Sequence, residues 1–299
     1  MATNDINSTL LGAVDIGSNA MRFLVSSANV YPSGTAFQRV EYMRYPIRLG
    51  EESFTTGIIS EKKIQKLIKM LQAFGTMFEV FEVLQYKVCA TSALRDAKNN
   101  EEILKKVFEQ TGITIQILSG DTEATLIDKA LGGHMQSGNY VHVDVGGGST
   151  EINIVENGEK KHYKSFNLGT VRAIHHTTDA KIWHELQDWV TTHIHELLYT
   201  TLGTGGNIKK LHELSGLPQE APMKRDTLLY IYENLKQMTI SQRMEILKLN
   251  ADRADVILPA CEIYLRIMQW AGSEMLLAPN IGLSDGIIID LWDSMRQNA

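Results

Sequence analysis

Three consecutive glycines, Gly146–Gly148, lie between two segments of alternating polarity, and this arrangement constrains the fold more than any other feature of the chain. Residues 140–145 and 150–155 carry valine or isoleucine at every second position, which is typical of β-strands. Glycines permit backbone angles that a Cβ forbids, and their peptide N–H groups are open to an anion. The stretch therefore predicts two strands joined by a phosphate-binding turn of Gly146, Gly147, Gly148 and Ser149.

Two carboxylates flank this turn. Asp144 ends the first predicted strand and Glu151 begins the second, so both side chains can reach the same space. Carboxylate oxygens are preferred ligands of divalent cations, and a cation held here would lie against a bound phosphate. The alternative is an ordinary β-hairpin turn with two solvated carboxylates, because short glycine motifs also occur without any such function.

Residues 10–25 repeat the same plan near the N-terminus. An apolar strand ends at Asp15, a turn of small residues contains Gly17, Ser18 and Asn19, and a second apolar strand follows. Asp15 and Asp144 are separated by roughly the length of one domain. Two such hairpins at this spacing resemble the phosphate loops of the actin, sugar-kinase and heat-shock ATPase superfamily, in which two related α/β domains flank a cleft.

This resemblance sets the expected domain organisation. Residues 1–125 should form an N-terminal actin-like α/β domain and residues 126–299 a C-terminal one, with Asp15 and Asp144 facing one cleft. A final helix around residues 286–295 is expected to cross back to the first domain. The chain has 299 residues, 43% of them hydrophobic and 21% charged, which suits a globular protein of two domains.

Composition also restricts the partners and the location of the protein. The formal net charge of −6 argues against a general nucleic-acid binder. Cys89 and Cys261 are too few for a disulfide framework, so a reducing cytoplasm fits. The N-terminus lacks the pattern of a signal peptide, and no apolar run approaches the ~20 residues that span a bilayer. We expect a cytoplasmic protein without nucleic-acid or membrane partners, and a homodimer is the default expectation for its oligomeric state.

Several charged residues have two interpretations. Arg95 follows the strand at 86–91, where open α/β sheets bind ligands, and its guanidinium suits a phosphate. A structural salt bridge to Asp96 or Asp121 is the alternative. Arg48 and Glu51 are expected either at the edge of the cleft or as a surface ion pair.

A turn at residues 156–159 is predicted from its Asn-Gly pair. Three lysines follow this turn: Lys160, Lys161 and Lys164. They could line a track for a polyanion, but solvated charge on an exposed strand is the preferred interpretation.

Four blocks resemble, in chain order, the exopolyphosphatase / guanosine pentaphosphate phosphohydrolase (Ppx/GppA) family in its short two-domain form. They are Asp15-Ile-Gly-Ser-Asn, Ala90-Thr-Ser-Ala-Leu-Arg95-Asp-Ala, Ser119-Gly-x-x-Glu123-Ala and Asp144-Val-Gly-Gly-Gly-Ser-Thr-Glu151. Looser matches follow at residues 166–172, 202–210, 253–259 and 281–286. The chain departs from the family pattern at two sites. Thr122 stands where many relatives carry a glutamate, and Ser284-Asp285 stand where Arg-Glu is expected.

The family resemblance implies a hydrolase that releases terminal phosphate from inorganic polyphosphate, and the residues do not decide between this substrate and guanosine pentaphosphate. It implies that Glu123 is the general base or positions the attacking water, and that Arg95 supplies a fixed positive charge. Mg²⁺ or another divalent cation would be held by Asp144 and Glu151, together with Asp15.

Two other functions use the same loops. A small-molecule kinase of this superfamily would transfer the phosphoryl group to a bound acceptor, for which the sequence offers no motif. A non-catalytic, nucleotide-responsive protein would use closure of the cleft as a switch. Release of inorganic phosphate from polyphosphate without an added acceptor would distinguish the hydrolase from both, whereas the fold alone would not.

Overall fold

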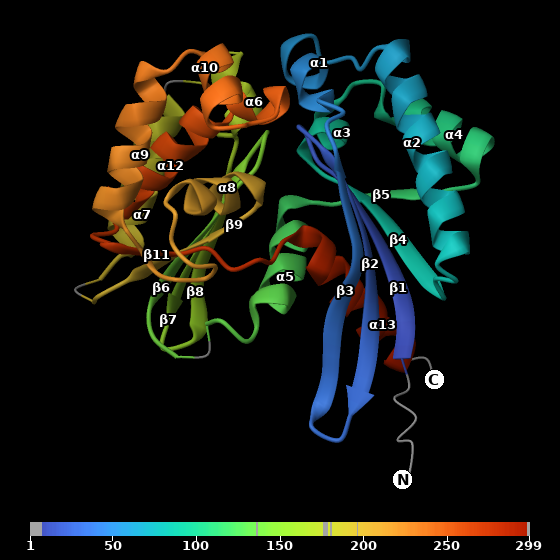
Figure 1. Ribbon diagram of the computed structural model, residues 1–299, viewed down its shortest axis with the longest axis horizontal. Helices are drawn as coiled ribbons and strands as arrows, with labels where there is room; N and C mark the ends of the chain where they lie inside the picture. The colour runs from blue at the N-terminus through green and yellow to red at the C-terminus, as the bar shows by residue number, and fades with distance from the viewer. Residues whose placement is uncertain (1–7, 136, 176–178, 180, 196, 298–299) are drawn as a thin grey trace. The chain divides into compact units, whose positions relative to one another are not determined.

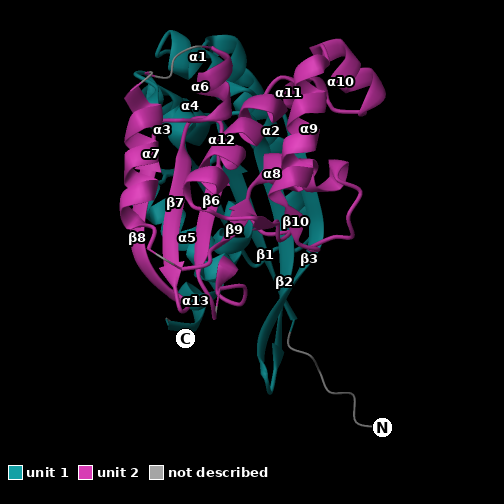
Figure 2. Cartoon of the chain, turned by 90° about the vertical axis from the view of Figure 1, so that its left-hand side faces the viewer, with its two compact units in different colours: residues 1–130, 283–299 teal, residues 131–282 magenta. Residues whose placement is uncertain are grey.

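The computed structural model describes residues 8–135, 137–175, 179, 181–195 and 197–297. The chain divides into two compact units (Figures 1 and 2). Unit 1 comprises residues 1–130 and 283–299, and unit 2 comprises residues 131–282. Each unit is built around one mixed β-sheet.

Unit 1 contains a five-stranded sheet in the order β3-β2-β1-β4-β5. Strands β1, β2 and β3 form an antiparallel meander, and β4 and β5 continue the sheet in parallel with β1. The elements of unit 1 are β1 (Ser8–Ile16), β2 (Met21–Tyr31), β3 (Gly34–Tyr45), α1 (Leu49–Thr55), α2 (Glu61–Val80), β4 (Gln85–Ala90), α3 (Ser92–Asp96), α4 (Asn100–Thr111), β5 (Ile115–Ile117), α5 (Gly120–Leu131) and α13 (Leu283–Gln297).

The core of unit 1 follows from simple periodicity. The apolar residues Ile64, Leu67 and Leu71 recur at helical spacing along α2 and are buried against β1 and β2. Ser60 caps this helix by accepting a hydrogen bond from the backbone N–H of Lys63. Helix α13 packs on β1, β2 and β4, so the last segment of the chain belongs to unit 1 (Figure 1).

Unit 2 contains a six-stranded sheet in the order β10-β11-β9-β6-β7-β8. Helix α12 packs on β6 and contacts the helices α6, α7, α8, α9 and α11. The elements of unit 2 are β6 (Tyr140–Val145), β7 (Thr150–Glu156), β8 (Glu159–Phe166), α6 (Thr170–Ile174), α7 (Lys181–His193), β9 (Thr200–Thr204), α8 (Gly206–Leu214), β10 (Met223–Lys224), α9 (Arg225–Gln237), α10 (Ile240–Ile246), α11 (Ala251–Ala254), α12 (Ile257–Trp270) and β11 (Met275–Leu277).

The two sheets share one plan. In unit 2 the antiparallel strands β6, β7 and β8 correspond to β1, β2 and β3, and the parallel strands β9 and β11 correspond to β4 and β5. Strand β10 is added at the edge of unit 2. Asp15 lies near the end of β1 and Asp144 lies near the end of β6, so the predicted pair of hairpins occupies equivalent places.

The division of the chain differs from the expected break at residues 125 and 126. That position falls inside α5, which continues from Gly120 to Leu131 as one helix, and the units separate after Ala130. Residues 283–299 also leave the second half and complete unit 1. Helix α13 lies so close to α5 that a glycine is required at the contact, because a Cβ on Gly286 would lie 2.0 Å from the carbonyl oxygen of Leu126.

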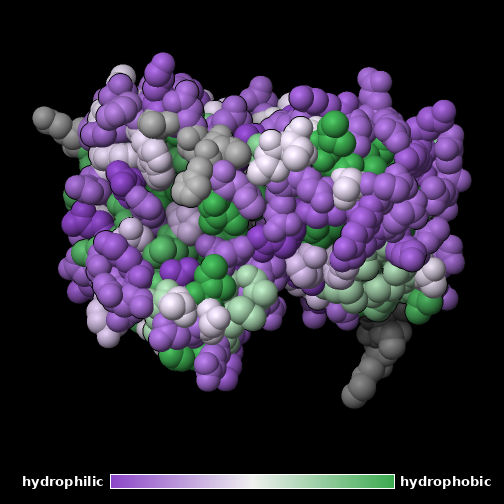
Figure 3. All heavy atoms as spheres, turned by 90° about the horizontal axis from the view of Figure 1, so that it is seen from above, coloured by the Kyte–Doolittle hydropathy of each residue, from purple (hydrophilic) through white to green (hydrophobic). Residues whose placement is uncertain are grey.

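The face shown in Figure 3 is largely hydrophilic, with apolar residues in small patches. Among the residues with described positions, no helix is both long and apolar enough to cross a bilayer. The turn between β7 and β8 is the predicted Asn-Gly hairpin, in which Asn157 and Gly158 both adopt positive φ angles of 52° and 80°.

Candidate active site

The glycine turn of unit 2 is held from one side by the segment that opens α6. The backbone N–H groups of Thr170 and Val171 donate to the carbonyls of Gly146 and Gly147, at 3.0 and 2.8 Å. The Nε of Arg172 donates to the carbonyl of Gly148 at 2.8 Å. In a trans peptide the N–H points away from the carbonyl. The N–H groups of residues 147, 148 and 149 therefore point away from α6, which is the arrangement of an anion-binding turn.

The N–H group of Gly146 has a different role. It donates to the carbonyl of Ser149 at 2.9 Å and closes the turn. Gly146 is thus a structural member of the expected phosphate loop, and the anion contacts that we expect from this loop belong to Gly147, Gly148 and Ser149.

Gly169 allows the α6 segment to approach the glycine turn. A Cβ at this position would lie 2.4 Å from the carbonyl carbon of Gly147 and 2.5 Å from that of Gly148. Contacts this short with backbone atoms cannot be relieved by rotating a side chain. The sequence showed Gly169 only as part of the loose family match at 166–172, and its role depends on a contact across the fold.

We expect Gly169→Ala to displace the glycine turn and to lower phosphate release by at least ~10²-fold, the usual cost of losing donors to a charged transition state. Gly133→Ala is the matched control, because a Cβ there meets no atom within 4 Å. Release of inorganic phosphate and thermal unfolding should be measured for both variants. Normal activity of Gly169→Ala would contradict the assigned role of this contact.

The turn of unit 1 is supported in the same way by the segment that opens α1. The N–H of Gly50 donates to the carbonyl of Ser18 at 2.8 Å, and the N–H of Arg48 donates to that of Asn19 at 3.0 Å. Gly17 closes its own turn by donating to the carbonyl of Ala20 at 3.1 Å. A Cβ on Gly50 would lie 3.0 Å from the Cβ of Ser18, so a glycine also permits this approach.

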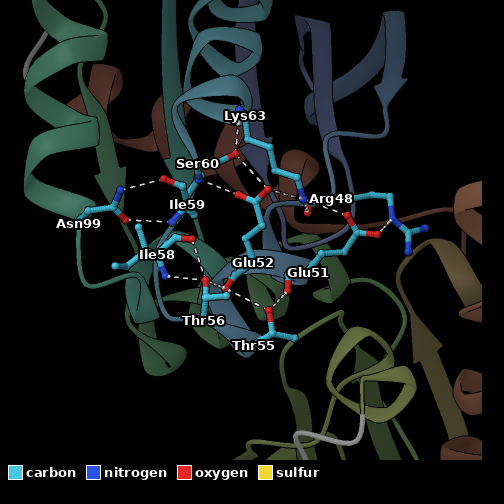
Figure 4. Close-up of polar contacts among 10 residues, drawn as sticks. All are labelled: Arg48, Glu51, Glu52, Thr55, Thr56, Ile58, Ile59, Ser60, Lys63 and Asn99. Atoms are coloured by element: carbon cyan, nitrogen blue, oxygen red, sulfur yellow. Dashed lines mark hydrogen bonds and ion pairs between the residues drawn. The ribbon is translucent and has the colours of Figure 1, made fainter.

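A polar network fixes the segment that follows Arg48 (Figure 4). Arg48 itself adopts a left-handed backbone, with φ of 55°, and its guanidinium pairs with Glu51. Lys63 of α2 bonds both to the carbonyl of Arg48 and, at 2.9 Å, to Glu51. Burial raises the pKa of Glu51, but the hydrogen bonds from Lys63 and Arg48 hold it below the usual value. The ion-pair interpretation of Arg48 and Glu51 is confirmed, and the pair anchors the support of the first turn.

The carboxylates at the two hairpins have different surroundings. Asp15 is opposite Arg22 in the β1–β2 register, and the two side chains form an ion pair at 2.6 Å. Asp15 is 3% exposed, and this burial raises its pKa although Arg22 acts in the opposite direction. In unit 2 the equivalent register pair is Asp144 and Glu151, two acids. Directly opposed side chains share one face of a sheet, with Cβ atoms about 4.5–5.5 Å apart.

Each acid of the unit 2 pair has a defined contact. The hydroxyl of Thr204, at the end of β9, donates to Oδ2 of Asp144 at 2.7 Å. The hydroxyl of Ser165 donates to Oε1 of Glu151 at 2.9 Å, and Glu151 is 2% exposed. Two acids on one face of a sheet, oriented by hydroxyl groups, offer the oxygen ligands that a hard divalent cation prefers.

Asp15, the third predicted cation ligand, belongs to unit 1, whereas Asp144 and Glu151 belong to unit 2. Within the described part of the chain, no group of three or more histidine, cysteine, aspartate or glutamate side chains is placed to hold a metal. The assignment of Asp144, Glu151 and Asp15 as cation ligands stays a prediction. Asp15 differs from the other two in its ion pair with Arg22.

Arg95 and Glu123 meet in unit 1 at the ends of β4 and β5. The Nη1 of Arg95 lies 3.9 Å from Oε2 of Glu123 and donates to the carbonyl of Leu118 at 2.9 Å. Glu123 lies in the first turn of α5, and its N–H donates to the carbonyl of Ser119. The Nε of Arg95 is also 3.8 Å from Oδ1 of Asp96, so the salt bridge given as the alternative interpretation of Arg95 is present as a long ion pair.

The departures from the family pattern have structural roles. Asp285 accepts two hydrogen bonds from Arg39 of β3, at 2.9 and 2.6 Å, which ties the start of α13 to the sheet of unit 1. Thr122 lies on the exposed side of the first turn of α5, 2.9 Å from the hydroxyl of Ser119.

The lysines after the β7–β8 turn are engaged with nearby residues. Lys161 pairs with Glu159 at 2.5 Å, Lys164 pairs with Glu185 at 2.8 Å, and Lys160 lies over the ring of Tyr163. These contacts agree with charge on a strand surface, the preferred interpretation, rather than with a track for a polyanion.

The model of the Ppx/GppA phosphatase family matches residues 31–295, which is most of the chain. The chain belongs to the Ppx/GppA phosphatase family. Among the curated relatives, Exopolyphosphatase 1 of Mycobacterium tuberculosis is 26% identical over 307 residues, covering 95% of this chain and 88% of that protein. The Bifunctional 3-dehydroquinate synthase/phosphatase of Fusobacterium nucleatum is 26% identical over 91% of this chain, which spans 45% of that longer protein.

Solved structures of Ppx/GppA proteins share the fold. The Aquifex aeolicus family member superposes with a TM-score of 0.77 at 22% identity, covering 98% of this chain and 99% of that one. An exopolyphosphatase from Cytophaga hutchinsonii superposes with a TM-score of 0.82 at 18% identity, covering 96% and 98%. The expected fold class, two α/β domains of the actin-like type, is confirmed. The position of Asp15 relative to Asp144 stays a prediction.

Proposed function

We propose that this phosphatase releases terminal phosphate from inorganic polyphosphate, with guanosine pentaphosphate as a second substrate. The observation that carries the proposal is the duplicated glycine hairpin. Each copy has an acid near the end of its first strand and a turn whose carbonyls are held from one side. This arrangement presents peptide N–H groups to an anion at two equivalent places, and the contacts it offers suit phosphate rather than a base or a sugar.

We further propose distinct roles for the two glycine turns. In unit 1, the N–H groups of Ser18 and Asn19 would bind one part of the phosphate chain, and Gly17, whose N–H donates to the carbonyl of Ala20, would close the turn around it. In unit 2, the N–H groups of Gly147, Gly148 and Ser149 would bind another. Hydrolysis of a phosphoanhydride needs a fixed phosphoryl group, neutralised charge and an oriented water, and the turns supply the first of these.

A divalent cation, with Mg²⁺ as our proposal, would be held by Asp144 and Glu151. The cation would neutralise charge on the phosphoryl oxygens when bound. The two acids are opposite one another and each accepts a hydrogen bond from a hydroxyl, so both are oriented before any ligand arrives. Asp15 would contribute less, because its ion pair with Arg22 already balances its charge.

Glu123 is the proposed general base and Arg95 the proposed electrostatic stabiliser. Their 3.9 Å separation places a carboxylate beside a guanidinium. A water bound by Glu123 would then be close to the positive charge that stabilises the phosphoryl group it attacks. Proton acceptance and charge stabilisation would thus come from two adjacent side chains of unit 1.

The cytoplasm is the proposed location. Cys89 and Cys261 are both reduced and buried, and burial raises the pKa of the Cys89 thiol to about 12. Such thiols resist oxidation and suit a reducing compartment. A homodimer is our proposal for the oligomeric state.

A side-by-side assay tests the function. Phosphate release from long-chain polyphosphate and from guanosine pentaphosphate should be followed with Mg²⁺ and with a chelator, with no phosphoryl acceptor added. We expect Mg²⁺-dependent release from polyphosphate, with gradual shortening of the chains on a gel. Lack of release from both substrates would contradict the hydrolase, and release only after addition of an acceptor would indicate a kinase.

Salt should weaken the binding of polyphosphate. The proposed contacts include the partly exposed guanidinium of Arg95, and the attraction between such a charge and a polyanion is screened as the Debye length falls to about 8 Å at physiological ionic strength. We expect KM for polyphosphate to rise between ~0.01 M and ~0.15 M KCl at saturating Mg²⁺, whereas an osmotically matched sucrose series should leave it unchanged. A KM that ignores KCl over this range would argue against electrostatic recognition.

A further inference from the structure

Two polar side chains lie in the middle of the unit 2 sheet, where apolar residues would be expected. His142 of β6 is 1% exposed, and Asn153 of β7 is completely buried. They are register partners across the β6–β7 ladder, so their side chains share one face of the sheet. Burying two polar groups is unfavourable unless each finds partners, and their presence calls for an explanation from the contacts that they make.

The two residues belong to a chain of hydrogen bonds that ends on Asp144. The Nδ2 of Asn153 is 2.8 Å from Nδ1 of His142, and Nε2 of His142 is 3.0 Å from Oγ1 of Thr204. The Thr204 hydroxyl then donates to Oδ2 of Asp144 at 2.7 Å. Strand geometry explains the alignment, because residues two positions apart on β6 point to the same side and Thr204 is the register neighbour of Asp144 on β9.

The chemistry of these groups sets the direction of every hydrogen bond. A threonine hydroxyl has one proton, and an ionised carboxylate can only accept. Thr204 gives its proton to Asp144, so it must accept from Nε2–H of His142. A neutral imidazole with its proton on Nε2 accepts a hydrogen bond at Nδ1, and the side-chain amide of Asn153 donates this bond. The reverse direction would leave two acceptors, Thr204 and an ionised Asp144, facing one another.

The backbone around this chain is fixed as well. The hydroxyl of the buried Tyr264 lies 2.9 Å from the carbonyl of Thr204 and 3.1 Å from that of Val143, linking the ends of β9 and β6. Gly205, with φ of 91°, follows Thr204, and a Cβ there would lie 3.0 Å from Oδ1 of Asp144. A larger residue at position 205 would crowd the second oxygen of the carboxylate.

We propose that His142 and Asn153 are positioning residues, which orient the Thr204 hydroxyl and thereby direct the carboxylate of Asp144 toward the divalent cation. This inference rests on the proposed function, because it assumes that Asp144 is a cation ligand. Partners behind metal ligands typically change metal affinity by 10- to 100-fold when they are removed. The sequence did not point to this series of hydrogen bonds, because Thr204 lies on another strand, 60 residues after Asp144.

Binding of Mn²⁺ alone, measured by calorimetry or electron paramagnetic resonance, tests the proposal without relying on turnover. The double variant His142→Val/Asn153→Val replaces both buried polar groups with apolar side chains, which a sheet interior accepts. We expect its Mn²⁺ affinity to fall by ~10- to 100-fold. His142→Gln retains an amide donor toward Thr204 and should recover part of the lost affinity.

Two single substitutions on β9 provide a matched comparison. Thr204→Val removes the hydroxyl that contacts Asp144, and we expect it to weaken Mn²⁺ binding as the double variant does. Thr201→Val removes an equally buried hydroxyl, whose side-chain partner is Ser273, and should leave the affinity unchanged. Thermal unfolding of each variant identifies any that fail to fold, and the remaining variants decide the outcome.

Turnover adds a second readout. If the hydrogen-bonded residues only position Asp144, the Mg²⁺ concentration for half-maximal phosphate release should be higher in His142→Val/Asn153→Val and Thr204→Val than in the wild type. Their maximal rate should recover at saturating Mg²⁺. Asp144→Asn distinguishes an error in the proposed cation site from an error in the positioning role of His142 and Asn153. If it leaves Mn²⁺ binding intact, the proposed cation site is wrong. If it abolishes binding while folded His142→Val/Asn153→Val and Thr204→Val bind Mn²⁺ like the wild type, the positioning role alone is overturned.

Discussion

Replacing Glu123 with glutamine should lower the rate of phosphate release on the order of 10²- to 10⁴-fold, the usual contribution of a general base. Glutamine keeps the size of the side chain and its hydrogen bonds but cannot accept a proton from the attacking water. KM for polyphosphate should change little, because the glycine turns and Arg95 are the proposed phosphate contacts. Steady-state kinetics on polyphosphate at saturating Mg²⁺ would measure both constants.

Asp121→Asn is the matched control for this experiment. Asp121 is an exposed acid in the same first turn of α5, so it shares any favourable interaction with the helix dipole. We expect this variant to retain near-normal turnover. If Glu123→Gln is folded and as active as Asp121→Asn, then Glu123 is a structural helix carboxylate, and Glu151 becomes the next candidate for the base.

Removing the guanidinium of Arg95 should have an effect of a different kind. Arg95→Ala should lower kcat by about 10²- to 10³-fold and also raise KM, because a fixed positive charge interacts with the phosphoryl group both in the bound substrate and in the transition state. Arg95→Lys keeps the charge but loses the planar pair of donors, so its activity should lie between those of Arg95→Ala and the wild type.

The structural contact of Arg95 requires its own control. Arg95 also donates to the carbonyl of Leu118 at the end of β5, so thermal unfolding must accompany the kinetics. Arg266→Ala removes an arginine that pairs with Glu262 along α12 and should change neither kcat nor KM. An Arg95→Ala protein with wild-type KM and kcat would show that the guanidinium serves only the fold.

The local parts of the fold could be predicted because their causes are local. Alternating valines and a glycine turn specify the β6–β7 hairpin, and Ser60 with its following apolar stripe specifies α2. The Asn157-Gly158 pair specifies the β7–β8 turn for the same reason, since both residues accept positive φ. In each case the deciding interactions join residues that are close in sequence.

What the sequence did not reveal depends on partners brought together by the fold. Gly50 and Gly169 matter because a preceding hairpin lies very close to them, through the Cβ of Ser18 at Gly50 and through the backbone of Gly147 and Gly148 at Gly169. The ion pair of Arg39 with Asp285 and the contact of Gly286 with α5 join segments more than a hundred residues apart. Thr204 likewise reaches Asp144 from another strand. The periodicity and spacing of residues in the sequence do not indicate which distant residues will be in contact.

The return of α13 to unit 1 has a consequence for synthesis of the protein on the ribosome. Unit 2 is a continuous segment, whereas in unit 1 the strands β1, β2 and β4 are covered by α13, which comes from the other end of the chain. While the first 130 residues emerge, α13 has not yet been synthesised, and the face of the unit 1 sheet that it covers stays open. Unit 2 can therefore complete its core before unit 1 does, although its synthesis begins later. We expect nascent chains halted before α13 to expose apolar surface and to be preferred clients of chaperones until the last helix leaves the exit tunnel.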